Sequence, residues 1–159
     1  MKWPPNWKPN WGLLVKPPRV ADRLDIRWQQ RFANFDRAFL LLKEVQERGV
    51  ASLSQLEKEG AIQRFEMAFE LAWKTLKDYL EESGLLVQVA APREVIKQAF
   101  QAGLLPDGQL WIDIMLHRNL LSHTYNQDTF HEVLEVIHDR YFPAFAQLHA
   151  FFQERMHPQ

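Results

Sequence analysis

The residues best suited to chemistry lie together between positions 118 and 126. This stretch, RNLLSHTYN, contains a guanidinium, two amides, two hydroxyls, an imidazole and a phenol. An arginine can hold a phosphate through two hydrogen bonds, and a histidine can move a proton near neutral pH. Phosphodiester cleavage needs both of these actions. The spacing alone leaves a plainer interpretation open, in which Arg118 and His123 are surface groups at the end of a helix.

The distance along the chain between Arg118 and His123 places a condition on any shared site. On one straight helix, two residues five positions apart diverge by about 140°. Asn126 is a good N-cap for a following helix, so we expect the chain to leave the preceding helix near His123. Leu120 and Leu121 would anchor the stretch against the core. Such a break would let the imidazole approach the guanidinium.

Other patterns of reactive residues in the chain are weaker. His131, Glu135 and His138 share one helical face by spacing, but a solvated face is commoner than a metal site. The absence of cysteine excludes disulfides, thiolate metal sites and a cysteine nucleophile. No glycine-rich spacing of the usual phosphate-binding loops occurs. The sequence therefore predicts neither a metal nor a cofactor.

The elements that must position the 118–126 stretch are helices. Apolar residues recur every three or four positions from residue 24 onward, and no alternating run predicts a convincing strand. Helix ends are expected at Gly49, Gly84 and Gly103, and a start near Asn126 or Asp128. The apolar stripes are as follows: Trp28, Phe32, Phe35, Phe39, Leu42; Ile62, Phe65, Phe69, Ala72, Leu76, Tyr79; Val95, Ile96, Ala99, Phe100 after Pro92; Leu110, Ile114, Leu121 after Gly108; Phe130, Leu134, Ile137, Tyr141, Phe145, Leu148, Phe152.

These stripes predict an all-α fold, an antiparallel up-and-down four-helix bundle with an additional short helix. The bundle is expected to occupy residues 24–155. Pro143 should kink or break the last helix, because proline lacks the amide hydrogen that an internal helical residue donates.

The first 23 residues differ from the rest in composition. They hold five of the nine prolines and have a charge balance of +4, whereas the whole chain has a net charge of −1. We expect an extended or disordered basic segment over 1–23, whose residues Trp3, Trp7 and Trp11 could pack on the folded body or on a partner. A near-neutral chain does not hold nucleic acid by bulk charge. With no bilayer-spanning run and no signal peptide, the expected location is the cytoplasm.

Three segments also resemble the nucleotidyltransferase substrate-binding protein family, which belongs to the HEPN superfamily. They are IQRFEMAFELAWKTLK at 62–77, PREVI at 92–96 with AF at 99–100 and GL at 103–104, and RNLLSHTYN at 118–126. HEPN proteins carry an Arg-x4–6-His motif with a polar residue after the arginine. Arg118 and His123 match that pair and Asn119 matches the polar residue. The resemblance covers roughly residues 25–152.

The resemblance implies a homodimeric four-helix bundle encoded beside a small nucleotidyltransferase that it binds. Related pairs behave as toxin–antitoxin systems in which the HEPN subunit is a metal-independent ribonuclease. In some of them the nucleotidyltransferase silences the toxin by adenylylating a tyrosine two positions after the motif histidine. Tyr125 occupies that position here.

Two functions therefore stay open at this point, with a third as the plain alternative. The first is a partner-binding subunit of a two-component nucleotidyltransferase system. The second is a ribonuclease that cuts RNA through Arg118 and His123, with Asn119 in support. In the third, the motif is only a structural network at a helix end. The sequence does not decide whether the chain is an enzyme, which RNA it would cut, or whether Tyr125 is modified.

Overall fold

Every regular element of the described chain is helical. The computed structural model describes residues 20–85, 87–124 and 126–156, with side chains from Arg27 onward, and it contains no strand within those ranges. The prediction of an all-α fold is therefore confirmed. The elements are α2 (Val20–Arg48), the 3-10 turn η1 (Val50–Ser52), α3 (Gln55–Glu82), α4 (Pro92–Gln101), α5 (Gly108–Leu121), α6 (Gln127–Val136), the π-turn η2 (Ile137–Tyr141) and α7 (Phe142–Met156).

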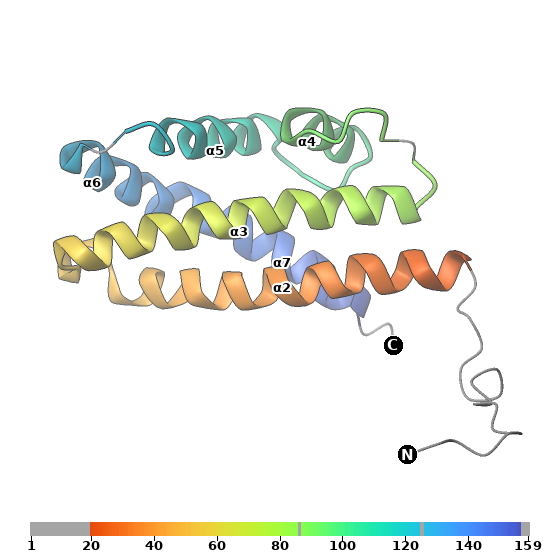
Figure 1. Cartoon of the computed structure of the whole chain (residues 1–159), viewed down its shortest axis with the longest axis horizontal. Coiled ribbons are helices and arrows are strands. Elements are labelled where there is room, and N and C mark those ends of the chain that lie inside the picture. The colour runs from red at the N-terminus through yellow and green to blue at the C-terminus, as the bar shows by residue number, and fades with distance from the viewer. Residues whose placement is uncertain (1–19, 86, 125, 157–159) are drawn as a thin grey trace, which may run out of the picture.

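The helices run back and forth along one long axis (Figure 1). The two longest, α2 and α3, form an antiparallel hairpin with the most extensive contacts in the molecule. The shorter helices α4 and α5 follow each other along α3 and return the chain to the end where α3 begins. From there α6, η2 and α7 run back as one helical course, with α7 against α2. The short additional helix of the prediction corresponds to α4.

The helix ends follow the capping chemistry of the sequence. Ser54 and Glu57 form a capping box at the start of α3, and the Asp107 side chain accepts a hydrogen bond from the Leu110 amide, at 3.0 Å, at the start of α5. Glycines with positive φ follow α2, α3 and α4 at the three predicted ends, Gly49, Gly84 and Gly103. A left-handed conformation costs glycine little, so the chain can turn sharply there.

Pro143 does not break the last helix. Its missing amide hydrogen leaves the carbonyl of Asp139 without the usual helical donor. The backbone widens just before it into the π-turn η2, in which the Phe142 amide donates to the Ile137 carbonyl five residues back. Of the predicted kink or break, the break does not occur: one wide turn lies before Pro143, and α6 and α7 stay in a single course.

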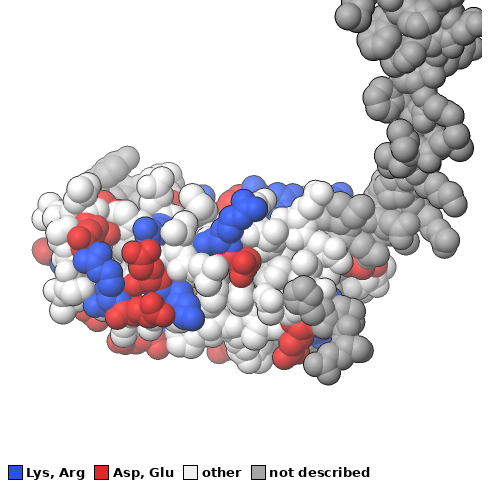
Figure 2. Space-filling view, turned by 90° about the horizontal axis from the view of Figure 1, so that it is seen from below, with Lys and Arg blue, Asp and Glu red and all other residues white. Residues whose placement is uncertain are grey.

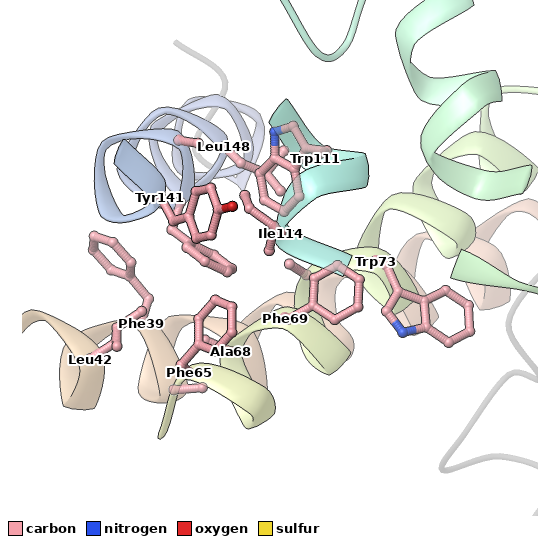
Figure 3. Close-up of a cluster of buried hydrophobic side chains, with 14 of the residues drawn as sticks. Phe39, Leu42, Phe65, Ala68, Phe69, Trp73, Trp111, Ile114, Tyr141 and Leu148 are labelled. Carbon is pink, nitrogen blue, oxygen red and sulfur yellow. The ribbon is translucent and has the colours of Figure 1, made fainter. Parts of the chain in front are cut away.

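The core is built from the predicted stripes. Figure 3 shows aromatic side chains from α2, α3, α5 and the η2–α7 region converging, including Phe39, Phe65, Trp111 and Tyr141. Phe100 is the exception, because it is 50% exposed. It packs over Gly108, where an added Cβ would lie 2.9 Å from its ring. The helical spacing was right for this residue but its assignment to the core was wrong.

The face of the molecule seen in Figure 2 carries both signs of charge close together. Seen from the α2 side, blue and red side chains are interspersed rather than gathered into one basic patch (Figure 2). In the described part of the chain, no helix combines the length and the apolar character needed to cross a bilayer. Helix α2 begins at Val20, four residues before the predicted start of the bundle. The three N-terminal tryptophans lie outside the described residues.

Candidate functional site

The chain leaves α5 within the predicted motif. Ser122 caps the helix, its amide donating to the carbonyls of Arg118 and Leu120, and the His123 amide donates to the Leu120 carbonyl at 3.2 Å. The next helix starts at Asn126, whose side chain accepts from the amides of Asp128 and Thr129. The expected helix end near His123 and the expected Asn126 cap are both confirmed.

Arg118 lies on the side of α5 that faces α3. The residue is half-buried, and its Nε atom is buried with no hydrogen-bond partner among the described residues. Its charge acts on Glu70, in the middle of α3. The structure thus holds a cation at this helix end whose hydrogen-bonding capacity is not used up.

Glu70 is held by its own helix. Its carboxylate accepts a 3.0 Å hydrogen bond from Trp73 Nε1 and pairs at 3.0 Å with Lys74 Nζ. Burial would raise the pKa of Glu70, but the hydrogen bonds from Trp73 and Lys74 and the charges of Lys74 and Arg118 outweigh it and lower that pKa. The Arg118 charge is thus close enough to α3 to contribute to the low pKa of Glu70.

His123 and Asn119 are both exposed. Within the described residues, His123 makes no side-chain hydrogen bond and no ion pair, and nothing joins its imidazole to Arg118. The two motif residues therefore belong to one helix end, but no hydrogen bond joins their side chains in the described structure. Both groups have unused hydrogen-bonding capacity within the described residues, and both are side chains suited to binding a phosphate or moving a proton. Tyr125, the candidate modification site, lies outside the described residues.

A groove of about 550 Å³ opens beside this helix end. One wall comes from the first half of α3, and the other comes from the last residue of α5, its cap and the start of α6. The lining residues are Glu59, Ile62, Gln63, Glu66, Leu121, Ser122, Gln127 and Phe130. The sequence did not reveal this groove, because the spacing of Glu59, Ile62 and Glu66 shows only that they share a helix face.

A hydrogen bond to the π-turn η2 also restrains α5 next to Arg118. Nδ1 of His117 hydrogen-bonds the hydroxyl of Tyr141, whose ring is fully buried in the π-turn. His117 directly precedes Arg118, so this bond restrains the rotation of α5 that aims the guanidinium at α3. The helical spacing predicted that Tyr141 lies in a core stripe and indicated no polar partner for its hydroxyl.

The predicted histidine face lies on α6 and continues into η2. His131 Nε2 lies 3.7 Å from Glu135 Oε1, and His138 Nδ1 lies 3.1 Å from its neighbour Asp139. Across residues 20–156, wherever the structure describes them, no group of three His, Asp or Glu side chains is placed to hold a metal ion. The arrangement agrees with a solvated helix face.

Comparison with known proteins identifies the family. The model of the family described as nucleotidyltransferase substrate binding protein like matches residues 30–154. The chain belongs to this family. The match runs through the helical body and the motif, and it confirms the resemblance carried by the three sequence segments.

Two relatives of this family member extend the comparison. A Haemophilus influenzae protein described as a probable ribonuclease HepT is 31% identical over 83 residues, which are 50% of this chain and 57% of that relative. The chain thus spans little more than half the length of that protein. A Thermus thermophilus protein of known crystal structure is 34% identical with a TM-score of 0.59, covering 77% of this chain and 98% of that one.

Proposed function

We propose that this chain is the binding subunit of a two-component nucleotidyltransferase system and that it cleaves RNA without a metal ion at Arg118 and His123. The observation that carries the second part is the helix end itself. It holds a guanidinium with an unpaired buried Nε and, five residues further along the chain, an exposed imidazole without a hydrogen-bond partner among the described residues. The ribonuclease description of the Haemophilus relative points the same way.

The cleavage step uses only side chains and the RNA. His123 removes the proton from a ribose 2′-hydroxyl, and the oxygen attacks the adjacent phosphorus. The bond from phosphorus to the 5′-oxygen breaks, and that oxygen takes up a proton. The products are a 2′,3′-cyclic phosphate and a 5′-hydroxyl. Arg118 stabilises the charge that builds on the non-bridging oxygens, and the Asn119 amide donates a further hydrogen bond to them.

One histidine per chain is sparse for both the removal and the return of a proton. A symmetric homodimer would supply a second motif to the same cleft. The outer side of α5 suits such a contact, because Leu116 and Leu120 are 49% and 47% exposed on successive turns next to Asn119. A helix that is apolar on both sides is usually covered on both. We assign this side of α5 to the second copy.

The first part of the proposal is supported by the family. A family described as nucleotidyltransferase substrate binding implies a nucleotidyltransferase partner. By resemblance, that partner would be small, encoded nearby, and able to neutralise the ribonuclease by adenylylating Tyr125. The two parts are compatible, since an antitoxin must bind its toxin.

Expression in a bacterial host tests both parts together. Wild-type chain should slow growth, co-expression with the small nucleotidyltransferase encoded beside it should restore growth, and the two proteins should co-purify. His123→Ala should remove the growth defect while retaining co-purification. His131→Ala, another exposed histidine, is the matched control and should still slow growth. A wild-type chain that neither slows growth nor retains the nucleotidyltransferase would contradict the proposal.

A further inference from the structure

The groove beside the motif has the make-up of a ligand site. Its base is apolar, since Ile62 and Leu121 are buried in the core and the half-buried Phe130 ring lines it. Its edge is polar, formed by two carboxylates, two amides and a hydroxyl. Small-molecule sites share this plan of an apolar cavity with a few polar groups that orient the ligand. A volume of about 550 Å³ leaves room for a planar heterocycle.

The polar groups of the groove are available to a ligand. Glu59, Gln63, Glu66 and Gln127 make no hydrogen bond or ion pair with any residue that the structure describes. Ser122 donates its hydroxyl hydrogen to the Arg118 carbonyl at 3.1 Å. The lining residues include two carboxylates and no Lys or Arg. An ionised carboxylate only accepts hydrogen bonds, so the groove repels a phosphate and favours a group with several N–H donors.

The groove is close to the proposed phosphate site. Ser122, which lines the groove, follows Arg118 by four residues, and its hydroxyl donates to the Arg118 carbonyl, so the groove begins about 6 Å along the helix axis from Arg118. One nucleotide can span such a step, with its phosphate at Arg118 and its base in the groove.

We propose that this groove is a nucleobase subsite that prefers guanine, with Glu66 as the reading residue and Phe130 as an apolar face for the ring. This inference rests on the proposed function in one respect, namely that Arg118 holds the phosphate of the same nucleotide. Guanine offers two parallel N–H donors, N1 and N2, to one carboxylate. Adenine, cytosine and uracil each offer a donor from only one nitrogen on that edge. Aromatic side chains commonly contact splayed bases in RNA recognition.

A basic segment of a protein is the competing occupant. Its Lys or Arg side chains would pair with Glu59 and Glu66. The observations favour the base, because a cationic segment would meet the like charge of Arg118 one turn away and would leave the amides and the Phe130 ring unused.

Binding of nucleoside 3′-monophosphates tests the subsite without any cleavage. The dissociation constants of the guanosine, adenosine, cytidine and uridine forms would be measured by calorimetry on the full chain. The variants would be Glu66→Gln, Phe130→Leu and Arg118→Gln. Glu132→Gln, an exposed glutamate on α6 outside the groove, is the matched control.

The expected result is about tenfold tighter binding of the guanosine form, the scale of one bidentate base contact. Glu66→Gln should reduce the affinity for the guanosine form to that of the other three nucleotides, whereas Glu132→Gln should leave the guanosine preference intact. Phe130→Leu should weaken all four forms, and Arg118→Gln should weaken all four by a common factor.

Two results would overturn the subsite. Equal binding of all four nucleotides, weakened by Arg118→Gln but unchanged by Glu66→Gln, would remove the base subsite and leave the phosphate site standing. Tight binding of a hexalysine peptide, lost in Glu66→Gln, with no binding of any nucleotide would assign the groove to a basic protein segment.

A guanine preference that survives in Arg118→Gln without any loss of affinity would instead contradict the phosphate role of Arg118 and leave the subsite in place.

Discussion

His117 and Tyr141 are joined by a hydrogen bond that ties the last turn of α5 to the π-turn before α7. Tyr141 is fully buried and stacks on Phe65 at a centroid distance of 6.3 Å, so its hydroxyl has one fixed position. Because His117 precedes Arg118, the bond also restrains the residue that faces α3. The His117–Tyr141 hydrogen bond thus links the π-turn before Pro143 to the helix end that carries Arg118.

Removal of the Tyr141 hydroxyl should destabilise the fold. Tyr141→Phe keeps the ring and leaves His117 without its buried partner, so we expect the free energy of unfolding to fall by about 1 kcal/mol. Urea unfolding at pH 7 measures it. Tyr79→Phe is the control, since its hydroxyl accepts from Arg155 Nε at 3.0 Å in an exposed contact and should matter less. Equal losses in both variants would contradict a special role for Tyr141.

The same tyrosine predicts a loss of stability at alkaline pH. Burial and the nearby negative charge of Asp113 raise the pKa of Tyr141 above its ordinary value of 10.0, and Arg140 only partly opposes them. Above pH 10 the unfolded chain therefore ionises first, and this contribution to stability is lost as the pH rises through the folded pKa. Urea unfolding between pH 8 and 11 should show a steeper decline in the wild type than in Tyr141→Phe. Parallel curves would show that Tyr141 contributes nothing to the alkaline decline.

Glu70 should make the stability of the fold depend on pH in the acid range. The pKa of Glu70 lies below its ordinary value of 4.5. Burial alone would raise this pKa, but the hydrogen bonds from Trp73 and Lys74 and the charges of Lys74 and Arg118 lower it by more. Its contribution is present above pH 4.5 and is lost as the pH falls through the folded pKa. Glu70→Gln should lower the free energy of unfolding at pH 7 and flatten its decline as the pH falls below 4.5. An acid decline as steep in Glu70→Gln as in the wild type would contradict this contribution of Glu70.

Asp78 should be the most sensitive carboxylate of the α2–α3 hairpin. It is 2% exposed and accepts hydrogen bonds of 3.0–3.1 Å from Arg27 and Arg31. Asp78→Asn should lower the free energy of unfolding by about 2 kcal/mol, because both arginines are partly exposed and solvent weakens the loss. Glu44→Gln removes an exposed pair with Arg64 and should cost below about 0.5 kcal/mol. Thermal or urea unfolding at pH 7 compares them, and similar costs would contradict the burial argument.

The local rules of the sequence predicted most of the fold. The spacing of apolar residues every three or four positions predicted the buried face of each helix. The glycines, Pro92 and Asn126 predicted where the helices end and begin. Both kinds of prediction succeed because helix periodicity and capping depend on residues within one or two turns of each other. Phe100 and Pro143 show the limit of local rules. Whether Phe100 faces the core depends on the close approach of Gly108, and whether Pro143 breaks its helix depends on the wide turn that Tyr141 helps to hold.

Part of the candidate site could also be predicted from the sequence, and part could not. The helix end that carries Arg118 and His123 followed from adjacent residues and from the Asn126 cap. The opposition of Glu70 to Arg118, the His117–Tyr141 bond and the groove bring together residues more than 20 positions apart. No spacing in one sequence reports such contacts, because they arise only when α3, α5 and the π-turn pack.

The most direct measurement is cleavage of a labelled RNA by the purified chain in EDTA, beside His123→Ala and the control His131→Ala. We predict cutting by the wild type and by His131→Ala, with 2′,3′-cyclic phosphate and 5′-hydroxyl ends, and none by a folded His123→Ala. Equal cutting by His123→Ala, or no cutting by any folded protein, would contradict the claim that this helix end is a metal-independent ribonuclease centre.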